Sequence, residues 1–546
     1  MRKKILFLTE ATYLNTGYST YCKEVMDRLH DSNKFEIAEL ASYGSIDDPR
    51  RKSIRWRNYP VVPSSSDPKE VHDLYNSNVS NQFGAWRFER ACIEFKPDIV
   101  VGVRDFWMDS FVKSSPYRKC FNFCWMPTVD ASPQNEEWVH YFSDANVITT
   151  YSDWAMDILN NQSNKINVAC STPPAASPLF CRVPDKRLHK QSMGINPEWK
   201  IIGTVMRNQR RKLFPELFEA FGLYLKETGD KNTYLYCHTS YPDNGWDLAK
   251  LMLKNEISSR VLMTYSCSAC GTTQVSKFND SVQQCPNCKE FASKPSSVST
   301  GVDTATLSKI YNCFDLYCQP ANSEGFGIGQ VEAAACGVPV CSTDYSAMAD
   351  VVRKVNGYPI RTQSLYEELE TGCMRAIPDV NHLYMIFKHF FSLSDREISE
   401  ESDKAVFGYN SHYSWDSTAK KWSDIFDSLP SGNWSLSSNK VNIPPLPEGM
   451  NNKEFVDWCL TTMMPEMNLV GSYEANCVLR DLNFGAFKPM PCAFFYSENS
   501  YFNRENYRTF DRNILYNMIR AKTEFKNFWE DVRVNGLKLK KENWIV

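Results

Sequence analysis

Two carboxylates bracket a glycine-rich stretch near the middle of the chain. Glu324 and Glu332 stand eight positions apart, with glycines at positions 325, 327 and 329 between them. A carboxylate can accept hydrogen bonds from two neighbouring hydroxyls, which suits the diols of a ribose or a hexose. The glycines allow close approach of the backbone to a ligand, and the alanine-rich segment 330–335 would begin a helix whose N–H groups attract phosphate. Together these features predict a site for a nucleotide sugar.

Two other interpretations of this stretch start from the same residues. A dinucleotide-binding fingerprint would need glycine at position 330, where glutamine stands, and would follow the first strand of a sheet rather than a late one. An oxidoreductase is therefore disfavoured. The plainer alternative is that one glutamate caps a helix while the other lies on its solvated face.

Four of the 19 cysteines form a second chemical pattern. Cys267 and Cys270 make one Cys-x2-Cys knuckle, and Cys285 and Cys288 make another, with fourteen residues between the two knuckles. This spacing is typical of a zinc ribbon, in which four thiolates enclose Zn²⁺ and leave no open position for catalysis. We expect a structural zinc ion in an insertion at residues 265–292. A redox-active thiol pair is the alternative, which the paired knuckles disfavour.

The order of apolar runs and amphipathic stretches predicts the scaffold that must position these residues. Short buried strands alternate with helices over the first 180 residues, and a second alternating series follows. Such alternation is typical of doubly wound parallel α/β sheets, whose ligands bind beyond the carboxyl ends of the strands. The expected strands are Ile5–Leu8, Ile99–Val103, Cys120–Met126 and Val147–Tyr151, then Ile201–Val205, Thr233–His238, Val261–Thr264, Leu316–Gln319 and Val338–Cys341.

A longer likeness joins the motif to this scaffold. The block Ser323–Gly327, followed by Glu332-Ala333 and Gly337–Val340, resembles the E-x7-E region of the retaining glycosyltransferases of GT-B fold often called family four. Further segments resemble that family in the same order along roughly residues 1–430: Asn15–Tyr18, Gly203–Lys212, Asp303–Tyr311, Thr343–Ala347 and Tyr413–Asp416. The resemblance implies two facing Rossmann-like domains with a donor sugar nucleotide bound between them.

The chain divides accordingly into five expected parts. They are an N-terminal acceptor domain at 1–182, a donor domain at 183–412 that contains the zinc-ribbon insertion, a helix at 413–430 that crosses back to the first domain, a flexible linker at 431–452 rich in Ser, Asn and Pro, and a mainly helical C-terminal extension at 453–546.

The resemblance also implies roles for individual residues. Glu324 would bind hydroxyls of the donor sugar, and Glu332 would bind the ribose. Arg207 and Lys212 would neutralise the diphosphate leaving group and take the place of a catalytic divalent metal. The donor pocket would be lined by Gly17, Gly325, Phe326, Gly327 and Ile328. The plain alternative for Arg207 and Lys212 is a solvated charge run, and for Gly17 it is an ordinary turn.

The first domain departs from the family pattern at one position. The family usually has a histidine at the end of a central strand near the acceptor, where this chain reads Trp125-Met126-Pro127-Thr128-Val129-Asp130. Asp130 is therefore the ionisable candidate for proton handling there, with Asp105 as a second. The plainer interpretation, which we favour for Asp130, is an ordinary loop or capping residue. His238, at the end of an expected strand, either faces the donor or lies satisfied in the core.

Composition and charge limit the remaining possibilities. The 546-residue chain is 42% hydrophobic and 23% charged, which is typical of a globular protein, and its formal net charge is −3. This charge gives no overall attraction to nucleic acid or anionic membrane. No apolar run reaches the length of a bilayer span, and the apolar run after Met1 ends at Glu10, as in a first strand rather than a signal peptide. We expect a soluble cytoplasmic protein.

The expected function is transfer of a sugar from a nucleotide-diphosphate donor to a hydroxyl with retention of configuration, on a glycan, small-molecule, protein or modified-DNA acceptor. Two alternatives remain open: glycosylation of hydroxylated bases in DNA, and a non-catalytic scaffold that binds sugar nucleotides. Interleaved basic and aromatic residues in the tail hint at nucleic acid, although acidic residues dilute them. The basic residues are Arg504, Arg508, Arg512, Arg520, Lys522, Lys526, Arg533, Lys538, Lys540 and Lys541.

Overall fold

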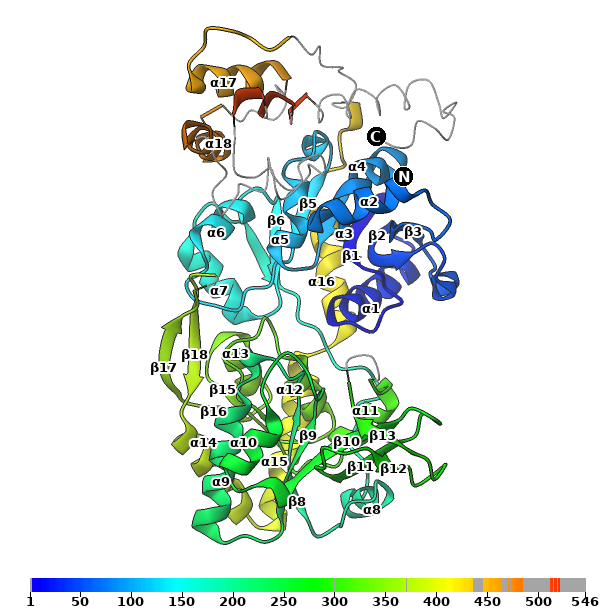
Figure 1. Ribbon diagram of the computed structural model, residues 1–546, viewed down its shortest axis with the longest axis vertical. Helices are drawn as coiled ribbons and strands as arrows, with labels where there is room; N and C mark the ends of the chain where they lie inside the picture. The colour runs from blue at the N-terminus through cyan, green and yellow to red at the C-terminus, as the bar shows by residue number, and fades with distance from the viewer. Residues whose placement is uncertain are drawn as a thin grey trace.

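The computed structural model describes residues 2–297, 301–369, 371–435 and 445–463, with parts of the tail at 470–471, 473–484, 511–513, 515–517 and 519–520. Two α/β domains lie one above the other in Figure 1, and a helical layer caps the first. Among the described residues, no helix is both long enough and apolar enough to cross a bilayer.

The first domain contains a seven-stranded parallel sheet with the order β3-β2-β1-β4-β5-β6-β7. The strands at the centre of this sheet are buried, and helices cover them, as parallel sheets require. The strands are β1 Lys3–Glu10, β2 Phe35–Ser45, β3 Arg57–Val62, β4 Ile99–Gly102, β5 Asn122–Trp125, β6 Val147–Thr150 and β7 Val168–Ser171. The helices are α1 Gly17–Asp31, α2 Lys69–Ser77, α3 Val79–Gln82, α4 Ala85–Phe95, α5 Phe106–Asp109, α6 Glu136–Phe142 and α7 Asp153–Gln162.

The second domain contains a parallel sheet in which β10-β9-β8-β14-β15-β16 are neighbours. These strands are β8 Lys200–Val205, β9 Thr233–His238, β10 Val261–Cys267, β14 Leu316–Gln319, β15 Val340–Thr343 and β16 Tyr358–Ile360. The helices are α8 Lys186–Ser192, α9 Phe214–Thr228, α10 Leu248–Lys254, α11 Thr304–Tyr311, α12 Ile328–Ala335, α13 Ser346–Lys354, α14 Val380–Ser392 and α15 Asp395–His412. The two predicted Rossmann-like domains are thus confirmed.

The cysteine-bearing insertion continues the second sheet instead of forming a separate module. Strand β10 pairs with β9 over its first half and extends to Cys267, beyond the predicted end at Thr264. Along one edge, Leu262–Ser266 of β10 pair with β11 Thr273–Lys277, and on the other edge Tyr265–Cys267 pair with β13 Phe291–Pro295. Strand β12 Gln283–Gln284 pairs with β13. The insertion is therefore anchored by the core strand from which it grows.

The predicted crossing helix is α16 Trp415–Ser428, which returns from the second domain to pack beside α1 (Figure 1). The Trp422 indole N–H donates to the Tyr21 hydroxyl at 2.9 Å, and the Lys3 ammonium donates to the Phe426 carbonyl at 2.8 Å. Trp422 is fully buried. The return of the helix therefore completes the core of the first domain.

The start of the expected linker is docked on the first domain, which corrects the prediction of a flexible tether from position 431. The Gly432 N–H donates to the Asp98 carboxylate at 2.8 Å, and the Trp434 indole N–H donates to the Pro97 carbonyl at 2.9 Å. The Trp434 ring also stacks on Tyr117. One tryptophan anchors a segment whose overall composition is typical of a loop; residues 436–444 of the linker lie outside the described residues.

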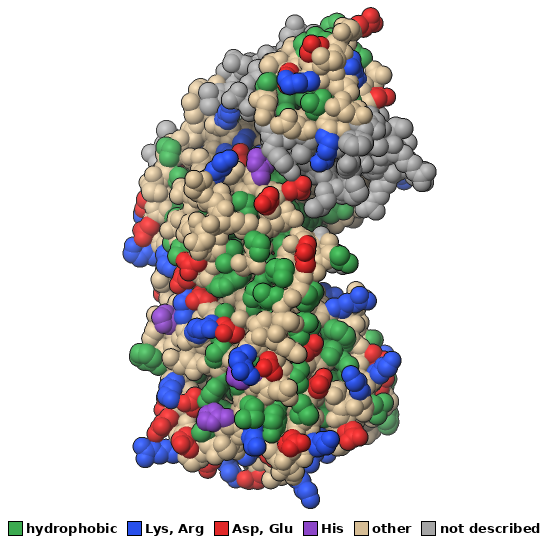
Figure 2. All heavy atoms as spheres, turned by 90° about the vertical axis from the view of Figure 1, so that its left-hand side faces the viewer, with side chains coloured by type: hydrophobic (Ala, Val, Ile, Leu, Met, Phe, Trp, Pro, Cys, Tyr) green, Lys and Arg blue, Asp and Glu red, His purple; other side chains and the backbone are tan. Residues whose placement is uncertain are grey.

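An antiparallel hairpin that the sequence did not predict joins the domains along one side. It consists of β17 Thr362–Glu367 and β18 Met374–Pro378. The hairpin lies at the left edge of Figure 1, and Figure 2 shows hydrophobic side chains gathered about halfway along this face of the molecule. Leu365, Tyr366 and Leu369 of the hairpin are all exposed.

The described part of the C-terminal extension is helical, as predicted. Helices α17 Asn452–Met463 and α18 Tyr473–Phe484 pack together with Leu515, Tyr516 and Ile519. Of the basic tail residues, Arg512 donates to Asn452 at 2.7 Å, and Arg520 is exposed. The rest of those basic residues lie outside the described residues: Arg504, Arg508, Lys522, Lys526, Arg533, Lys538, Lys540 and Lys541.

Candidate functional site

Glu324 lies at the carboxyl end of β14, in the loop that leads to α12, and is only 7% exposed. Its carboxylate forms ion pairs with the Lys212 ammonium and, at 2.8 Å, with the Arg211 guanidinium. Both cations come from the short turn that follows β8, and β8 is the neighbour of β14 in the sheet. Sheet adjacency therefore brings together charges that are more than 110 residues apart.

The charges at this point are strongly coupled. Burial alone would raise the pKa of Glu324, but the ion pairs with Lys212 and Arg211 outweigh it and lower the pKa to about 2. Burial lowers the pKa of Lys212, and the attraction to Glu324 opposes that effect. The carboxylate is ionised throughout the neutral range and holds two cations at the mouth of the glycine loop.

Buried side chains pack against the glycine loop and leave no room for a Cβ at positions 327 and 329. Gly327 has φ +85°, and a Cβ there would lie 2.7 Å from the Gln330 amide nitrogen. A Cβ at Gly329 would lie 2.3 Å from the Tyr317 hydroxyl. Gln330 is fully buried, and its amide has no hydrogen-bond partner among the described residues. An unsatisfied buried amide beside a helix N-terminus is suited to a polar ligand group.

Glu332 lies on α12, half-buried, and accepts a hydrogen bond from the Tyr311 hydroxyl at 2.8 Å. Burial raises the pKa of this carboxyl to about 7, although the Tyr311 hydrogen bond opposes the increase. Glu332 is therefore the one of the two glutamates that changes its charge near neutral pH. Glu324 is fixed as an anion.

Polar side chains connect the two glutamates underneath the loop. The Gln319 amide donates to Glu324 at 3.4 Å, and the Tyr317 hydroxyl donates to the Gln319 side-chain oxygen at 2.9 Å. The Tyr317 and Tyr311 rings are 5.7 Å apart, and Tyr311 binds Glu332. These buried groups hold the two carboxylates in fixed positions on either side of the loop.

Arg207 and His238 lie at the ends of the neighbouring strands β8 and β9. The Arg207 guanidinium is paired with Asp243 at 2.8 Å, in contrast to Lys212, which contacts Glu324 directly. His238 Nδ1 lies 2.8 Å from the Thr264 hydroxyl, and burial lowers the pKa of His238 to about 4. The imidazole is therefore neutral at pH 7 and half-buried at the edge where ligands bind in such sheets.

The remaining predicted loop residues divide between core and surface. Phe326 is buried and packs edge-on against Tyr413, with ring centroids 5.8 Å apart, so its backbone, and not its ring, faces a ligand site. Ile328, the first residue of α12, is 38% exposed. Gly17 is the first residue of α1, and the space that its Cβ would enter is open. An open helix N-terminus is a suitable place for a phosphate.

The first domain touches the glycine loop through Thr128. A Cβ on Gly325 would lie 2.4 Å from the Thr128 methyl, so the two domains approach closely at this glycine. The Tyr18 hydroxyl lies 3.0 Å from the Thr128 hydroxyl and donates to Asp105 at 2.9 Å. Asp105 is thereby linked to the loop through Tyr18 and Thr128.

Asp130 bridges the domains a little further along. Its carboxylate pairs with the Arg375 guanidinium at 2.9 Å and accepts a hydrogen bond from Ser323 at 3.4 Å. Burial raises the pKa of Asp130, and the Arg375 charge opposes the increase. Arg375 comes from β18 and also pairs with Glu368 at 2.9 Å. The hairpin therefore holds Asp130 beside the residue that precedes Glu324.

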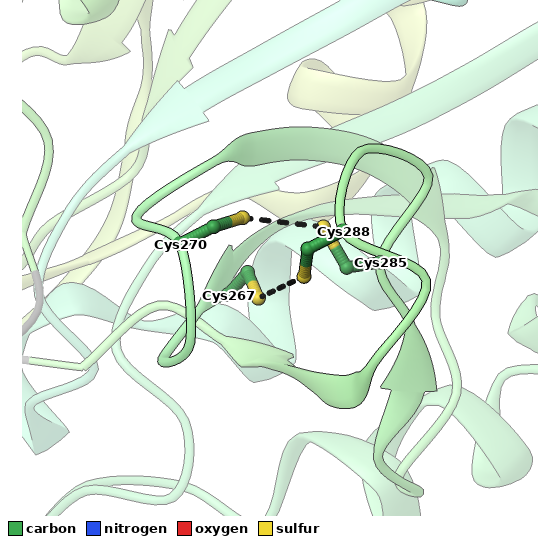
Figure 3. Close-up of side chains that lie close together, drawn as sticks. All are labelled: Cys267, Cys270, Cys285 and Cys288. Atoms are coloured by element: carbon green, nitrogen blue, oxygen red, sulfur yellow. Dashed lines mark hydrogen bonds between the residues drawn. The ribbon is translucent and has the colours of Figure 1, made fainter.

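The four predicted zinc ligands are gathered in one place. Figure 3 shows the side chains of Cys267, Cys270, Cys285 and Cys288 pointing toward one another. The Sγ atoms of Cys267 and Cys288 are 3.6 Å apart, as are those of Cys270 and Cys285. All four sulfur atoms lie within 4.8 Å of one another.

Sequence reasoning missed several residues of this site. Arg211 stands next to Lys212 in a basic run, so the prediction of Lys212 as a phosphate-binding residue could have been extended to Arg211. Gln319 and Gln330 are polar residues in buried segments, which marks them as candidates for a ligand contact. Arg375 left no signal, because its role depends on a long-range approach of the hairpin to Asp130.

The contact between Gly325 and Thr128 predicts a compensating pair of substitutions. Gly325→Ala places a methyl group against the Thr128 methyl and should cost about 1–3 kcal/mol of stability or open the domains. Thr128→Ser removes that methyl and retains the hydroxyl that contacts Tyr18. Thermal unfolding and small-angle scattering should show the defect in the single variant and recovery in the double variant. Additive effects would contradict the contact.

Comparisons with known proteins agree with this geometry. Residues 294–379 match the family model described as glycosyl transferases group 1, a segment that contains both glutamates and the glycine loop. No curated protein matches the chain.

Solved structures match over most of the chain at low sequence identity. Sucrose-phosphate synthase from Thermosynechococcus elongatus is similar with a TM-score of 0.56 and 13% identity, over 78% of this chain and 99% of that one. Alr3699/HepE from Anabaena, solved with UDP and glucose, has a TM-score of 0.53 and 12% identity, over 78% and 100%. The glycosyltransferase WaaG has a TM-score of 0.51 and 15% identity, over 78% and 100%. The chain has the GT-B fold, with a segment that matches the group 1 glycosyl transferases.

Proposed function

We propose that the protein is a retaining glycosyltransferase that moves a sugar from a nucleoside-diphosphate donor to an acceptor hydroxyl. The observation that carries the proposal is the glycine loop, in which Glu324 holds Lys212 and Arg211 at one end and Glu332 stands at the other. Between them lies the Gln330 amide, which has no hydrogen-bond partner in the described part of the chain. The similar structure of HepE in complex with UDP and glucose supports this class of donor.

In this proposal Glu324 exchanges partners when the donor binds. Its carboxylate accepts hydroxyls of the sugar, and Lys212 and Arg211 turn to the diphosphate, whose charge replaces that of Glu324. Arg207, paired with Asp243 at the next strand end, contributes a further positive charge. Gly17 at the start of α1 offers backbone N–H groups from the opposite domain. Preorganised charges of this kind stabilise a departing diphosphate without a divalent metal.

Transfer then requires one bond to break and another to form at the anomeric carbon. The bond from that carbon to the diphosphate oxygen breaks, and the acceptor oxygen bonds to the same face of the carbon, which retains its configuration. The acceptor proton passes to the departing diphosphate. Asp130 and Asp105 are the two candidate carboxylates for orienting the acceptor hydroxyl, since both adjoin the glycine loop through Ser323 and Thr128.

We also propose that the four cysteines hold a structural zinc ion. Tetrahedral Zn–S bonds of about 2.3 Å place the sulfur atoms about 3.8 Å apart, and the Sγ separations of 3.6 Å fit that geometry. Four thiolates leave no open position, so the ion would stabilise the insertion and take no part in transfer. The ion would hold together the ends of β10 and β13.

The first prediction concerns Glu324. Glu324→Gln removes the charge that binds the sugar hydroxyls and holds Lys212, so transfer and slow donor hydrolysis should both fall by about 10²–10³-fold. The measurement is turnover of a panel of nucleotide sugars by the purified protein. Glu400→Gln, at an exposed glutamate on α15, is the matched control and should retain full activity. Full activity in the Glu324 variant would remove the proposed donor site.

The second prediction concerns pH. Glu332 accepts ribose hydroxyls best as an anion, and its pKa of about 7 means that the free protein takes up a proton as the pH falls through 7. Donor affinity should therefore fall by up to about ten-fold between pH 8 and pH 6. Calorimetry with an intact nucleotide sugar avoids titration of the ligand, because both phosphates are esterified.

Tyr311→Phe provides the test of that assignment. Loss of the Tyr311 hydrogen bond, which opposes the raised pKa, should shift the fall in affinity to higher pH. Tyr384→Phe, on α14, controls for the loss of a tyrosine hydroxyl. A pH profile that is the same in the Tyr311 variant and the wild type would separate Glu332 from donor binding.

The third prediction concerns zinc. Metal analysis should find about one zinc per chain, and Cys285→Ser should lose the ion and lower the melting temperature, because zinc binding contributes to folding. Cys181→Ser changes an exposed cysteine outside the cluster and should keep the zinc. Full zinc content in the Cys285 variant would refute the assignment.

A further inference from the structure

Three aromatic side chains form a row at the edge of the first domain. The Phe83 ring packs edge-on against Tyr43 on one side, at 5.8 Å between centroids, and against Trp107 on the other, at 5.0 Å. Phe83 is buried, whereas Tyr43 is 42% exposed and Trp107 is 45% exposed. We refer to Tyr43, Phe83 and Trp107 as the aromatic platform. The rings of Tyr43 and Trp107 are thus exposed to solvent and pack on the buried ring of Phe83.

A fully buried cation supports the platform. The Arg104 guanidinium donates to the Ser42 hydroxyl, to the Phe83 carbonyl at 3.2 Å, and to Asp109, with which it forms an ion pair. Ser42 precedes Tyr43, and Asp109 lies on the same short helix as Trp107. One side chain therefore joins the three segments that carry the rings. Burying an ion pair is an expensive way to gain stability, so its presence here favours a role in positioning.

The backbone at Tyr43 also favours a functional role. Tyr43 adopts φ +58°, a left-handed conformation that is unfavourable for a residue with a side chain. Such conformations persist where the surrounding structure enforces them, commonly at binding sites. The next residue, Gly44, has no room for a Cβ, which would lie 2.9 Å from Ala11. The exposed Tyr43 ring is therefore positioned by a backbone segment with little conformational freedom.

The platform lies on the edge of the sheet that faces the donor loop. Tyr43 is near the carboxyl end of β2, Glu10 ends β1, and Asp105 and Trp107 follow β4; these strands are consecutive neighbours in the sheet. Asp105 is linked through Tyr18 to Thr128, which touches Gly325. Strands β2 and β4 are two strand spacings apart, or about 10 Å. The platform thus extends away from the point where the two domains meet.

The side chains along this edge define the chemistry of a ligand. Exposed aromatic rings pack against the C–H faces of sugar rings, and the half-buried Asp105 carboxylate can accept hydroxyl hydrogen bonds. Glu10 is buried and already accepts a hydrogen bond from the Thr16 hydroxyl, so it adds negative charge to this edge. Arg104 is neutralised by Asp109, and Arg50 on the same rim is paired with Asp48. A polymer of phosphates would meet carboxylates here, so a neutral, hydroxyl-rich ligand fits the edge better than a nucleic acid.

We propose that the aromatic platform binds a glycan acceptor, contacting sugar residues beyond the one whose hydroxyl reacts. The proposal rests on the glycosyltransferase function for its catalytic consequence, but binding of the glycan does not depend on that function. The acceptor would lie along the ends of β2, β1 and β4, with its reacting end at Asp105 and the glycine loop. An oligosaccharide should therefore bind more tightly than the monosaccharide it is built from.

The test measures binding of neutral hexasaccharides and their monosaccharides, a panel of α- and β-linked glucose and N-acetylglucosamine oligomers, by calorimetry and saturation-transfer NMR. At least one hexasaccharide should bind wild type at least ten-fold more tightly than its monosaccharide. Tyr43→Ala and Trp107→Ala should each raise that Kd about ten-fold, the change expected on loss of one ring's contacts. Trp107→Phe keeps a ring and should recover most of the affinity.

Phe407→Ala is the matched control for the loss of an exposed ring. Phe407 lies on α15 in the second domain, so its replacement should not change the Kd. Melting temperatures show whether each variant folds, and the phenylalanine variant remains informative if an alanine variant does not. No binding by any hexasaccharide, equal affinity in the alanine variants, or binding of single-stranded DNA through the platform would overturn the proposal. Glycan binding through the platform without donor turnover in wild type would refute the enzymatic function and leave the platform standing.

Discussion

The ion pairs of Glu324 with Lys212 and Arg211 are the interaction on which the site depends. A buried carboxylate needs partners, and here they come from the end of the adjacent strand β8. Removing one member of a buried pair typically costs about 3–5 kcal/mol, so the charges are kept together unless a ligand replaces them. A sugar diphosphate offers such a replacement, because its hydroxyls satisfy the carboxylate and its phosphates satisfy the cations. In the proposed function, the same interaction stabilises the free protein and recognises the donor.

Other contacts in the fold hold the first domain against the glycine loop. Helix α16 returns to the first domain and completes its core through Trp422. Arg375 of the hairpin holds Asp130 beside the glycine loop, and Gly325 meets Thr128 without an intervening side chain. The carboxyl ends of both sheets therefore face a common space. The aromatic platform extends that space along β1 and β2, so the proposed donor and acceptor sites belong to different domains.

The sequence predicted those parts of the structure that local patterns determine. The buried strands, the glycine turn and the four cysteines are all visible as apolar runs or fixed spacings, and the crossing of the helix after Tyr413 followed from the family resemblance. Contacts between distant segments were not predictable in the same way. Arg375 reaches Asp130 across 245 residues, and Trp434 docks a segment whose composition is typical of a flexible linker. Arg207 and Lys212 both follow β8, so the path of the turn after that strand decides that Lys212, and not Arg207, reaches Glu324. A single sequence does not reveal that path.

A crystal structure of the protein with an intact nucleotide sugar tests the central claim most directly. The account predicts density along the glycine loop, with sugar hydroxyls on Glu324, ribose hydroxyls on Glu332, and the diphosphate at the start of α12. Lys212 should have left Glu324 for the phosphates. Density away from the loop, or a bound donor with the Lys212–Glu324 pair unchanged, would contradict it.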